Sequence, residues 1–528
     1  MTLLSRICRF LLLSIAVMIL IPTKAYSVDY HVGPGQALLE LDQVPWLELV
    51  AGDTVNIYYR AEPYRTKIGL RAQGTEAQPI VIRGLPGING EKPVISGQNA
   101  RTPASLAQAG FFSAQYDENL ALILIKRGPN DDYATDKPSH IIIEGLKLTG
   151  AYEAYSYTNS AGNIVNYSDG AAPVWAVLVD NLIVRNCELT DSGNGLFVLS
   201  KPGGAQQVSH NILVEHNYIH GNGTTGARFD RHHNIYTQAS GIVFQYNHFG
   251  RLRPGAGGSV LKDRSGGTII RFNWVETGAR VLDLVDPEEA YDYLVPRESV
   301  LGRPLNQDEL DRLSRFRNTY VYGNIFVNDL LDNTTASTSN MFHYGGDTGV
   351  EGIYRKGVLH FYNNTVYIRT NQSLAYFMRL FDLSTNDETV SLKNNIFYQD
   401  GDSLLRIGNR FGRISFDSAN FINPNWGDFR AAAPGASVTI AQGVSLIESN
   451  TSCFNNKDIF DFSLQPDSVC IDEGTTSLGN AVIDKVYVSP YNFSPRQITG
   501  AGIDLGAYED GSAPLARIPN PPTNLRAE

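Results

Sequence analysis

The sequence has few charges, few cysteines and, after its first residues, no long apolar run. Charged residues fill 18% of the 528 positions and hydrophobic residues 42%, a composition that argues against intrinsic disorder and allows a large core. No apolar run beyond the N-terminus approaches the roughly 20 residues of a bilayer-spanning helix. We therefore expect a folded protein that does not insert into a membrane.

Positive charge is also scarce, and the formal net charge is -11 at neutral pH. A protein that binds nucleic acid or an anionic membrane surface through general electrostatics needs a basic face. We expect neither partner. An anionic substrate is compatible with this balance, because the local field of a site can oppose the net charge.

The N-terminus resembles an export signal. Arg6 and Arg9 precede an apolar run from Phe10 to Ile21, and a polar stretch with small residues ends at Ser27. These three regions, in this order, are typical of a cleavable signal peptide. We predict cleavage after Ser27 and a secreted or periplasmic protein that works as a monomer.

One pattern recurs along the chain: alternating apolar residues, an asparagine, then apolar or aromatic residues. The alternation predicts strands, and most spacings of about 25 to 31 residues suit one coil of a solenoid. Stacked asparagines can bond the backbone and one another, so we expect this column to be structural. Its members are Asn186, Asn217, Asn247, Asn273, Asn324, Asn364, Asn395 and Asn420.

The repeat is interrupted by residues 287–317, which are rich in Glu, Asp, Leu and Arg and predict an inserted helical loop. Insertions in a solenoid often frame its binding face. No composition shift divides the chain, so we predict one solenoid domain over residues 28–510 and a disordered tail or linker over 511–528. Cys453 and Cys470 could pair in an oxidising compartment, with two buried thiols as the alternative.

Two segments resemble known proteins. Near the N-terminus, Gly52-Asp53 opens a turn before an alternating strand, and residues 74–84 read GTEAQPIVIRG one turn later. Near the C-terminus, residues 504–509 read DLGAYE. The first segment resembles the opening coils of secreted polysaccharide lyases of the chondroitinase B and alginate lyase group, in the pectate lyase superfamily. The second resembles the closing motif of bacterial β-helix proteins. The resemblance implies an all-β fold, a right-handed parallel β-helix, over nearly the whole mature chain.

A second column of short strands precedes the asparagine-bearing ones. Successive side chains of a strand point to opposite faces, so placing the apolar ones inside leaves a polar set outside. Such a ridge in neighbouring coils suits a groove for an extended polyanion, and we expect an acidic polysaccharide as substrate. The predicted outward set is Asn234, Tyr236, Lys262, Arg264, Asp283, His343, Arg379 and Arg406.

A lyase acting on uronates needs a group that neutralises the carboxylate, a base for the C5 proton and a proton donor for the leaving oxygen. Lys262 is our candidate base, with Arg264 beside it favouring the uncharged amine. Arg264 and Arg271 are candidates for binding the carboxylate. His233 or Tyr236 would donate the proton.

Lys262 also matches the catalytic lysine of the lyases that residues 259–273 resemble. One coil later those proteins carry an arginine, whereas this sequence has Asp283. Hydrolysis or epimerisation through Asp283 and Asp286 is therefore an alternative, as is a non-catalytic carbohydrate-binding protein. Asp283, Asp286 and Glu288 could bind Ca²⁺, or they could be solvated acids. Lys262 and Arg264 could also pair structurally with Asp263 or Asp283.

Overall fold

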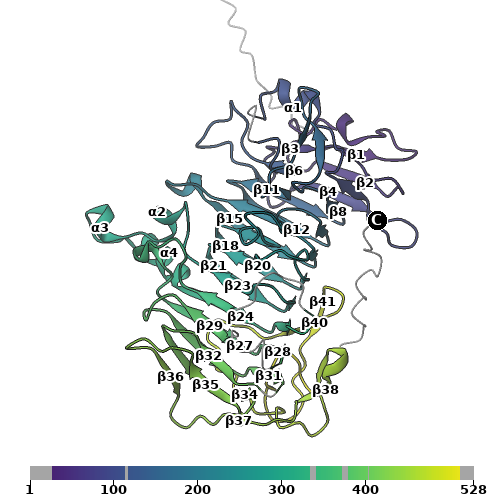
Figure 1. Cartoon of the computed structure of the whole chain (residues 1–528). Coiled ribbons are helices and arrows are strands. Elements are labelled where there is room, and N and C mark those ends of the chain that lie inside the picture. The colour runs from purple at the N-terminus through teal and green to yellow at the C-terminus, as the bar shows by residue number, and fades with distance from the viewer. Residues whose placement is uncertain (1–26, 113–116, 333–339, 372–378, 402, 512–528) are drawn as a thin grey trace, which may run out of the picture.

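The computed structural model describes residues 27–112, 117–332, 340–371, 379–401 and 403–511, which form a stack of coils (Figure 1). The expected signal peptide, apart from Ser27, and residues 512–528 of the expected tail lie outside this part. Each coil contributes one strand to each of three long sheets, in which all neighbouring strands are parallel. The chain is a right-handed parallel β-helix, so the solenoid predicted from the repeat and the β-helix implied by the resemblance are both confirmed.

Sheet 1 has 13 strands: β1 (Asp29–Val32), β2 (Thr54–Tyr58), β4 (Ile80–Leu85), β7 (Ser139–Glu144), β12 (Asp180–Arg185), β15 (Ser209–Glu215), β18 (Ala239–Gln245), β21 (Gly266–Arg271), β24 (Asn318–Tyr322), β27 (Val358–Tyr362), β30 (Thr389–Lys393), β33 (Arg413–Phe416) and β36 (Ser437–Ile440). Sheet 2 has 11 strands: β3 (Ile68–Leu70), β6 (Ala121–Ile125), β11 (Ala172–Val177), β14 (Leu196–Leu199), β17 (Ile235–Thr237), β20 (Ser259–Asp263), β23 (Arg280–Leu284), β26 (Asn340–Tyr344), β29 (Arg379–Leu383), β32 (Leu405–Gly408) and β35 (Trp426–Phe429).

Sheet 3 also has 11 strands: β5 (Val94–Ser96), β8 (Lys147–Thr149), β13 (Glu188–Thr190), β16 (Tyr218–His220), β19 (His248–Phe249), β22 (Trp274–Val275), β25 (Ile325–Asp329), β28 (Thr365–Arg369), β31 (Ile396–Asp400), β34 (Phe421–Ile422) and β37 (Ile447–Glu448). Three antiparallel hairpins lie outside these sheets: β9 (Ser156–Thr158) with β10 (Ile164–Asn166), β38 (Phe454–Asn456) with β39 (Asp461–Leu464), and β40 (Lys485–Val488) with β41 (Asn492–Pro495).

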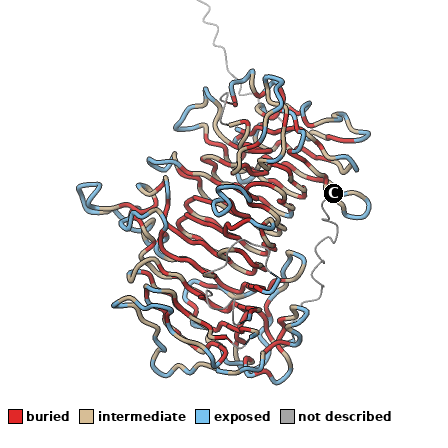
Figure 2. The backbone as a smooth tube through the Cα atoms, in the orientation of Figure 1, coloured by how far each residue is buried: buried red, intermediate tan, exposed pale blue. Residues whose placement is uncertain are grey.

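The inward side chains of all three sheets form one continuous apolar core, which the buried segments trace down the stack (Figure 2). One inward row of sheet 1 runs through Phe244, Ile270 and Val321, and all three are fully buried. Because every coil packs only on its neighbours, the core grows with the number of coils. This explains how one solenoid can include most of a 528-residue chain.

The asparagine column lies at the turn between sheet 1 and sheet 3. The Asn247 Oδ1 atom accepts hydrogen bonds from the backbone N and the Nδ2 of Asn217, both at 3.0 Å, and Asn247 in turn donates to Asn273. The same exchange continues through Asn420. The predicted structural role is confirmed for these coils.

The prediction that Asn186 is the first member of the asparagine column is wrong. Asn186 is exposed, with a positive φ of 50°, and the buried Cys187 occupies the ladder position. The Cys187 backbone N donates to Asn217 Oδ1 at 2.9 Å. The residue before each ladder position takes the left-handed conformation in several coils, as at Tyr246 and Phe272, and in this coil Asn186 takes that place.

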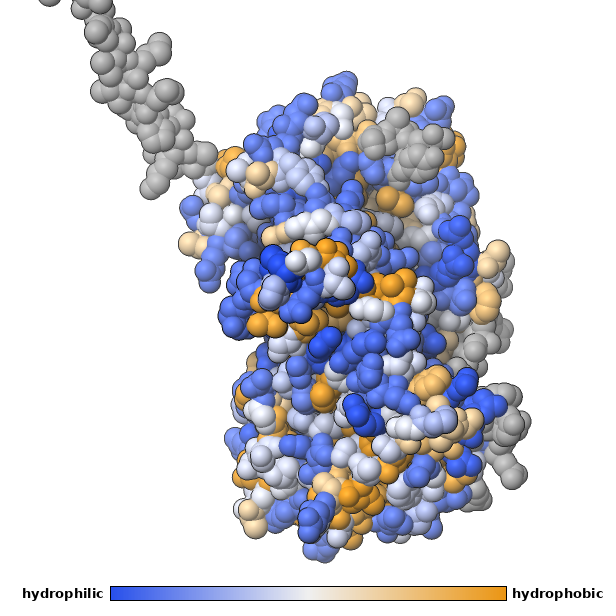
Figure 3. Space-filling model, turned by 90° about the vertical axis from the view of Figure 1, so that its left-hand side faces the viewer, coloured by the Kyte–Doolittle hydropathy of each residue, from blue (hydrophilic) through white to orange (hydrophobic). Residues whose placement is uncertain are grey.

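The segment 287–317 contains three helices: α2 (Tyr291–Leu294), α3 (Glu298–Leu301) and α4 (Gln307–Arg317). They project from one side of the stack (Figure 1), and α4 packs against β21 and β24. A view from that side shows a largely hydrophilic surface with smaller hydrophobic patches (Figure 3). A further helix, α1 (Ala104–Gln108), lies near the N-terminal coils.

C-terminal segments cover the outer face of sheet 3. Phe454 and Phe462 pack there in a cluster with Trp274 and Tyr367, and the Cys453–Cys470 disulfide belongs to the same cluster. The sequence left open a disulfide or two buried thiols for Cys453 and Cys470, and the structure has the disulfide. In the described part of the chain, no helix is both long enough and apolar enough to cross a membrane.

Candidate active site

A row of outward side chains crosses sheet 2. Tyr236, Lys262, Asp283 and His343 are direct register partners on the successive strands β17, β20, β23 and β26. Neighbouring strands lie about 4.8 Å apart, so each side chain reaches the next. The period-two alternation of the sequence predicts this placement. Tyr236, Lys262 and Asp283 form the floor of a groove of about 660 Å³.

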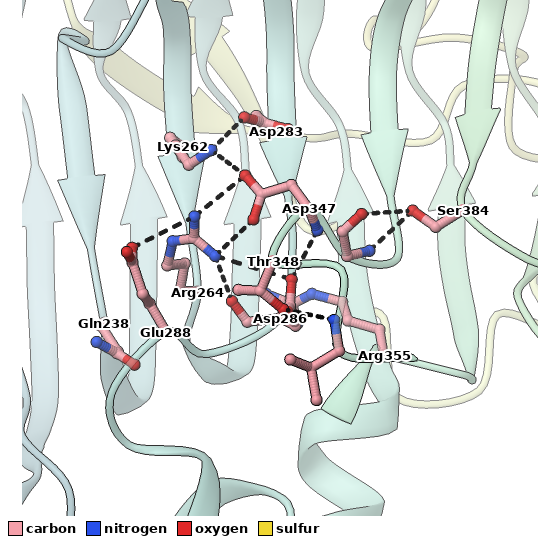
Figure 4. A network of polar contacts seen from close by, with 12 residues as sticks. Gln238, Lys262, Arg264, Asp283, Asp286, Glu288, Asp347, Thr348, Arg355 and Ser384 are labelled. Carbon is pink, nitrogen blue, oxygen red and sulfur yellow. Dashed lines mark hydrogen bonds and ion pairs between the residues drawn. The ribbon is translucent and has the colours of Figure 1, made fainter. Parts of the chain in front are cut away.

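Lys262 lies between two carboxylates (Figure 4). Its Nζ donates to Asp283 Oδ2 at 2.9 Å and to Asp347 Oδ2 at 2.5 Å. Burial alone would raise the pKa of Asp283, but the charges of Lys262 and Arg280 and a hydrogen bond from His343 lower it well below its usual range. Burial also opposes ionisation of Asp347, yet Lys262 and Arg264 outweigh it and lower that pKa too. Both acids are therefore ionised at neutral pH.

Arg264 follows β20 and binds the other side of Asp347. Its Nη1 lies 2.8 Å from Asp347 Oδ1 and its Nη2 3.1 Å from Oδ2, a two-pronged contact that fixes the carboxylate. The Arg264 Nε donates to Tyr236 Oη at 2.9 Å, and Tyr236 donates to Glu288 at 2.8 Å. Burial raises the pKa of Tyr236. Tyr236 is thus a poor base in this setting and remains a hydroxyl donor.

Asp283 is held from its other side by a histidine and a serine. His343 Nδ1 lies 2.6 Å from Asp283 Oδ1, and His343 Nε2 lies 3.1 Å from Ser384 Oγ. The Ser384 hydroxyl also accepts from the backbone N of Gly346 at 2.8 Å. This chain connects the floor of the groove to the loop that carries Asp347.

Asp347 is the main site residue that the sequence did not reveal. It lies in the loop 345–350, after β26, where no periodic pattern marks the direction of side chains. The loop is fixed from below, because the Asp347 backbone N donates to Asp286 Oδ1 at 2.8 Å and Thr348 donates to Asp286 Oδ2. A side chain at Gly346 would lie 2.0 Å from the ring of Tyr354, so only glycine fits there. The glycine-rich sequence of the loop was the available signal.

The segment between this loop and β27 is anchored by a buried arginine. Arg355 is fully buried, and its Nη2 donates to the backbone O of Asp263 at 3.1 Å and lies 3.5 Å from Asp263 Oδ2. Asp263 also accepts hydrogen bonds from Thr237 and Thr268 inside the coil. The possible pairing of Lys262 or Arg264 with Asp263 is therefore wrong, whereas the Lys262 pairing with Asp283 is present.

His233 lines the groove just before β17. Its Nδ1 accepts the backbone N–H of Ser259 at 2.8 Å. Burial, and next the charge of Lys262, lower the pKa of His233 well below its usual range. The ring is therefore neutral and carries its proton on Nε2, for which the described residues supply no hydrogen-bond partner. An N–H donor is thus available to a bound molecule.

Two expected groove residues lie elsewhere. Asn234 is fully buried and points into the coil, where its Nδ2 donates to Gly250 O at 2.7 Å and its Oδ1 accepts from Asn222. Arg271 lies on sheet 1, where it binds Gln245 and Tyr322. Arg379 and Arg406 do lie on sheet 2, at register-paired positions farther along the stack.

The expected calcium ligands do not come together. Asp283 contacts Lys262, Asp286 holds the loop of Asp347, and Glu288 accepts from Tyr236. Within the part of the chain that the structure describes, no three Asp, Glu, His or Cys side chains are grouped to hold a metal ion. Asp286, whose pKa is raised by burial, lies beneath the groove and not on its wall.

No protein-family model and no curated protein sequence matches this chain. Among solved structures, pectate lyase Pel9A matches at 10% identity with a TM-score of 0.35, covering 88% of this chain and 89% of its own. The alginate lyase of Paenibacillus sp. str. FPU-7 matches at 11% identity with a TM-score of 0.26, covering 75% of this chain and 93% of its own. The PL6 family polysaccharide lyase Pedsa3628 of Pseudopedobacter saltans matches at 13% identity with a TM-score of 0.30, covering 76% of this chain and 88% of its own.

The strand pairing itself establishes the expected parallel β-helix fold. At these identities and TM-scores the matches carry no argument about substrate or reaction.

Proposed function

We propose that this protein is an enzyme that cleaves an acidic polysaccharide by β-elimination in the groove on sheet 2. The observation that carries the proposal is the cluster on the groove floor, where Lys262 contacts Asp347 directly and His233 offers a free N–H. The expected signal sequence supports action outside the cytoplasm, and we propose that the protein acts as a monomer.

Two arginines of the groove suit the substrate carboxylate. Arg231 is exposed, lines the groove and has no side-chain partner among the described residues. Arg280 also lines it and contacts Asp283 through Nη1 at 3.1 Å, with the rest of its guanidinium available. A guanidinium can bind a carboxylate with two parallel hydrogen bonds. Such neutralisation makes the C5 proton of a uronate more acidic.

The base in this proposal is Lys262, and Asp347 is the group that frees it. A bound sugar excludes water from the groove, and a low dielectric favours a neutral pair over an ion pair. The proton on Lys262 Nζ then passes along its hydrogen bond to Asp347. The resulting amine has a lone pair directed into the groove.

The elimination balances with the groups present. The amine of Lys262 takes the C5 proton, the electrons of the C5–H bond form the C4–C5 double bond, and the C4–O bond breaks. His233 Nε2–H donates a hydrogen bond to the leaving oxygen, and that oxygen takes its proton from Asp347, which received it from Lys262. Lys262 is then an ammonium and Asp347 a carboxylate again, so the starting protonation states are restored.

Hydrolysis is the second candidate, and one distance favours it. Both Asp283 Oδ2 and Asp347 Oδ2 contact Lys262 Nζ, at 2.9 and 2.5 Å, so they lie at most 5.4 Å apart. Retaining glycosidases place their two carboxyl groups about 5–5.5 Å apart. Against this candidate, both carboxylates are held by cations, Asp283 by Lys262 and Arg280 and Asp347 by Lys262 and Arg264, so neither is free to attack a sugar.

The product distinguishes the two reactions. The purified protein is incubated with polygalacturonate, alginate, hyaluronate and chondroitin sulfate, and near-ultraviolet absorbance and reducing ends are followed together. Elimination produces both signals, because each cut leaves an unsaturated uronate. New reducing ends without absorbance would replace elimination by hydrolysis, and neither signal on any polymer would contradict the proposal.

A further inference from the structure

An aromatic ridge leads along sheet 2 into the catalytic cluster. Trp175, Phe197 and Tyr236 are direct register partners on β11, β14 and β17, and Lys262 is the next member of the same row. The Trp175 and Phe197 rings stack at 3.8 Å between centroids and 14° between planes, and the Phe197 and Tyr236 rings at 4.7 Å and 2°. The ridge is therefore a rigid continuation of the groove floor.

This ridge lies on the outer face of the solenoid, and all three of its rings are partly exposed. Their faces cover one another, so the ridge presents ring edges outward. Phe229, which is 36% exposed, lines the groove beside the end of the ridge. Partly exposed apolar surface that runs directly into a polar site marks a ligand-binding groove.

The other end of the groove floor is charged. Beyond Lys262 the row continues through Asp283 and His343 to Asp382, and Arg379 and Arg406 are paired at the start of neighbouring strands.

Arg406 is the group at this end that can bind an anion. Arg406 is partly exposed and has no side-chain partner among the described residues. The register partner of Arg406 on β35 is Gly427, where a side chain would come within 2.7 Å of Arg406 Nη1. The glycine keeps the guanidinium in the position that the structure shows.

We propose that the two ends bind different parts of one polymer. The sugars over the ridge of Trp175, Phe197 and Tyr236 are uncharged and bind through their apolar C–H surfaces, and the sugars near Arg406 are acidic. The substrate is thus a heteropolysaccharide with uncharged and acidic sugars on opposite sides of the cleaved bond. From the strand spacing, the ridge extends about 14 Å from Lys262, and Arg406 lies about 19 Å away on the other side. This inference rests on the proposed function and assigns the substrate class of the same groove.

Binding at two salt concentrations tests the inference. Dissociation constants are measured for the same four polymers and for xanthan, which contains both acidic and uncharged sugars, in a Lys262→Ala background that prevents turnover. Trp175→Ala and Phe197→Ala should weaken binding of xanthan by about tenfold at both low and high salt, because apolar contact is not screened. Arg406→Ala should weaken binding by about tenfold at low salt and have little effect at ~0.5 M salt, where exposed charges are screened.

Ile183→Ala is the matched control, because Ile183 is a partly exposed apolar residue on the outer face of sheet 1 and should not affect binding. Phe197→Leu keeps apolar volume, so it tests the ridge even if the alanine variant does not fold, and it should weaken binding of xanthan less than tenfold but measurably. Ridge variants that bind as the background does, or whose loss disappears at high salt, would overturn the inference while leaving the cleavage site intact. A background protein that binds none of the five polymers would overturn both the inference and the proposed function.

Discussion

Two columns of side chains run through the same coils and differ in one respect. The column from Asn217 to Asn420 repeats one residue, and each member bonds the next in the same way. The column through Tyr236, Lys262 and Asp283 changes its residue at every strand. Repetition satisfies the backbone of a turn in every coil, whereas variation brings unlike groups together once.

The repeated asparagine column contributes to stability, whereas the varied column through Lys262 contains the groups that can do chemistry. A ladder of identical amides is fully satisfied by its own members and leaves no free group for a ligand. The outer column gathers a cation, carboxylates and a neutral imidazole within a few ångströms of one another. Substitutions in one column should therefore affect folding, and substitutions in the other should affect turnover.

The largest effect should come from Asp347→Asn. The amide cannot accept the proton of Lys262, so turnover should fall by roughly 10²–10³-fold, within the range of lost acid–base catalysis. Steady-state kinetics on a cleaved polymer measures the loss. Asp230→Asn is the control, because Asp230 lines the same groove but is exposed and has no ion pair among the described residues. Full turnover in Asp347→Asn would remove this residue from the mechanism.

Asn247→Ala should give the converse result. It leaves the backbone N and the Nδ2 of Asn217 without their acceptor, and both are buried. Each unpaired donor costs about 1–3 kcal/mol, so for the two donors we expect a loss of about 2–6 kcal/mol in the free energy of unfolding by urea. The exposed Asn425→Ala should change it by less than ~0.5 kcal/mol. Wild-type stability together with lost turnover in Asn247→Ala would contradict the division between the columns.

A smaller effect should appear in the pH dependence of stability. The folded protein lowers the pKa of Asp283 well below its usual value of 3.8, so folding favours the ionised form. This contribution is present above pH ~4 and is lost as the pH falls below it. The difference in unfolding free energy between wild type and Asp283→Asn should therefore be larger at pH 6 than at pH 3. The difference for Asp230→Asn should stay nearly constant, and the same constancy for Asp283→Asn would show that its ionisation does not stabilise the fold.

Much of the fold and part of the site could be predicted from the sequence. Alternation with period two fixes which residues of a strand face outward, and it placed Tyr236, Lys262 and Asp283 in one row. It failed for Asn234, because that residue precedes β17 at a corner where the chain turns and alternation no longer applies. Arg271 was misassigned because the pattern does not say which of three sheets faces a ligand.

The loop residues could not be predicted for a different reason. Asp347 and Arg355 lie between β26 and β27, outside any repeat, and reach the groove or the core only through the course of the loop. The direction of a side chain in a loop depends on long-range contacts, such as the bonds of Asp286 to Asp347 and Thr348. No local pattern of residues encodes them.

The central claim is that Lys262 performs chemistry in the outer column. Its most direct test is the turnover of folded Lys262→Ala, measured by the near-ultraviolet absorbance of the unsaturated product. The account predicts a loss of roughly 10²–10⁴-fold with little change in polymer binding. A folded Lys262→Ala protein that turns over at the wild-type rate would contradict it.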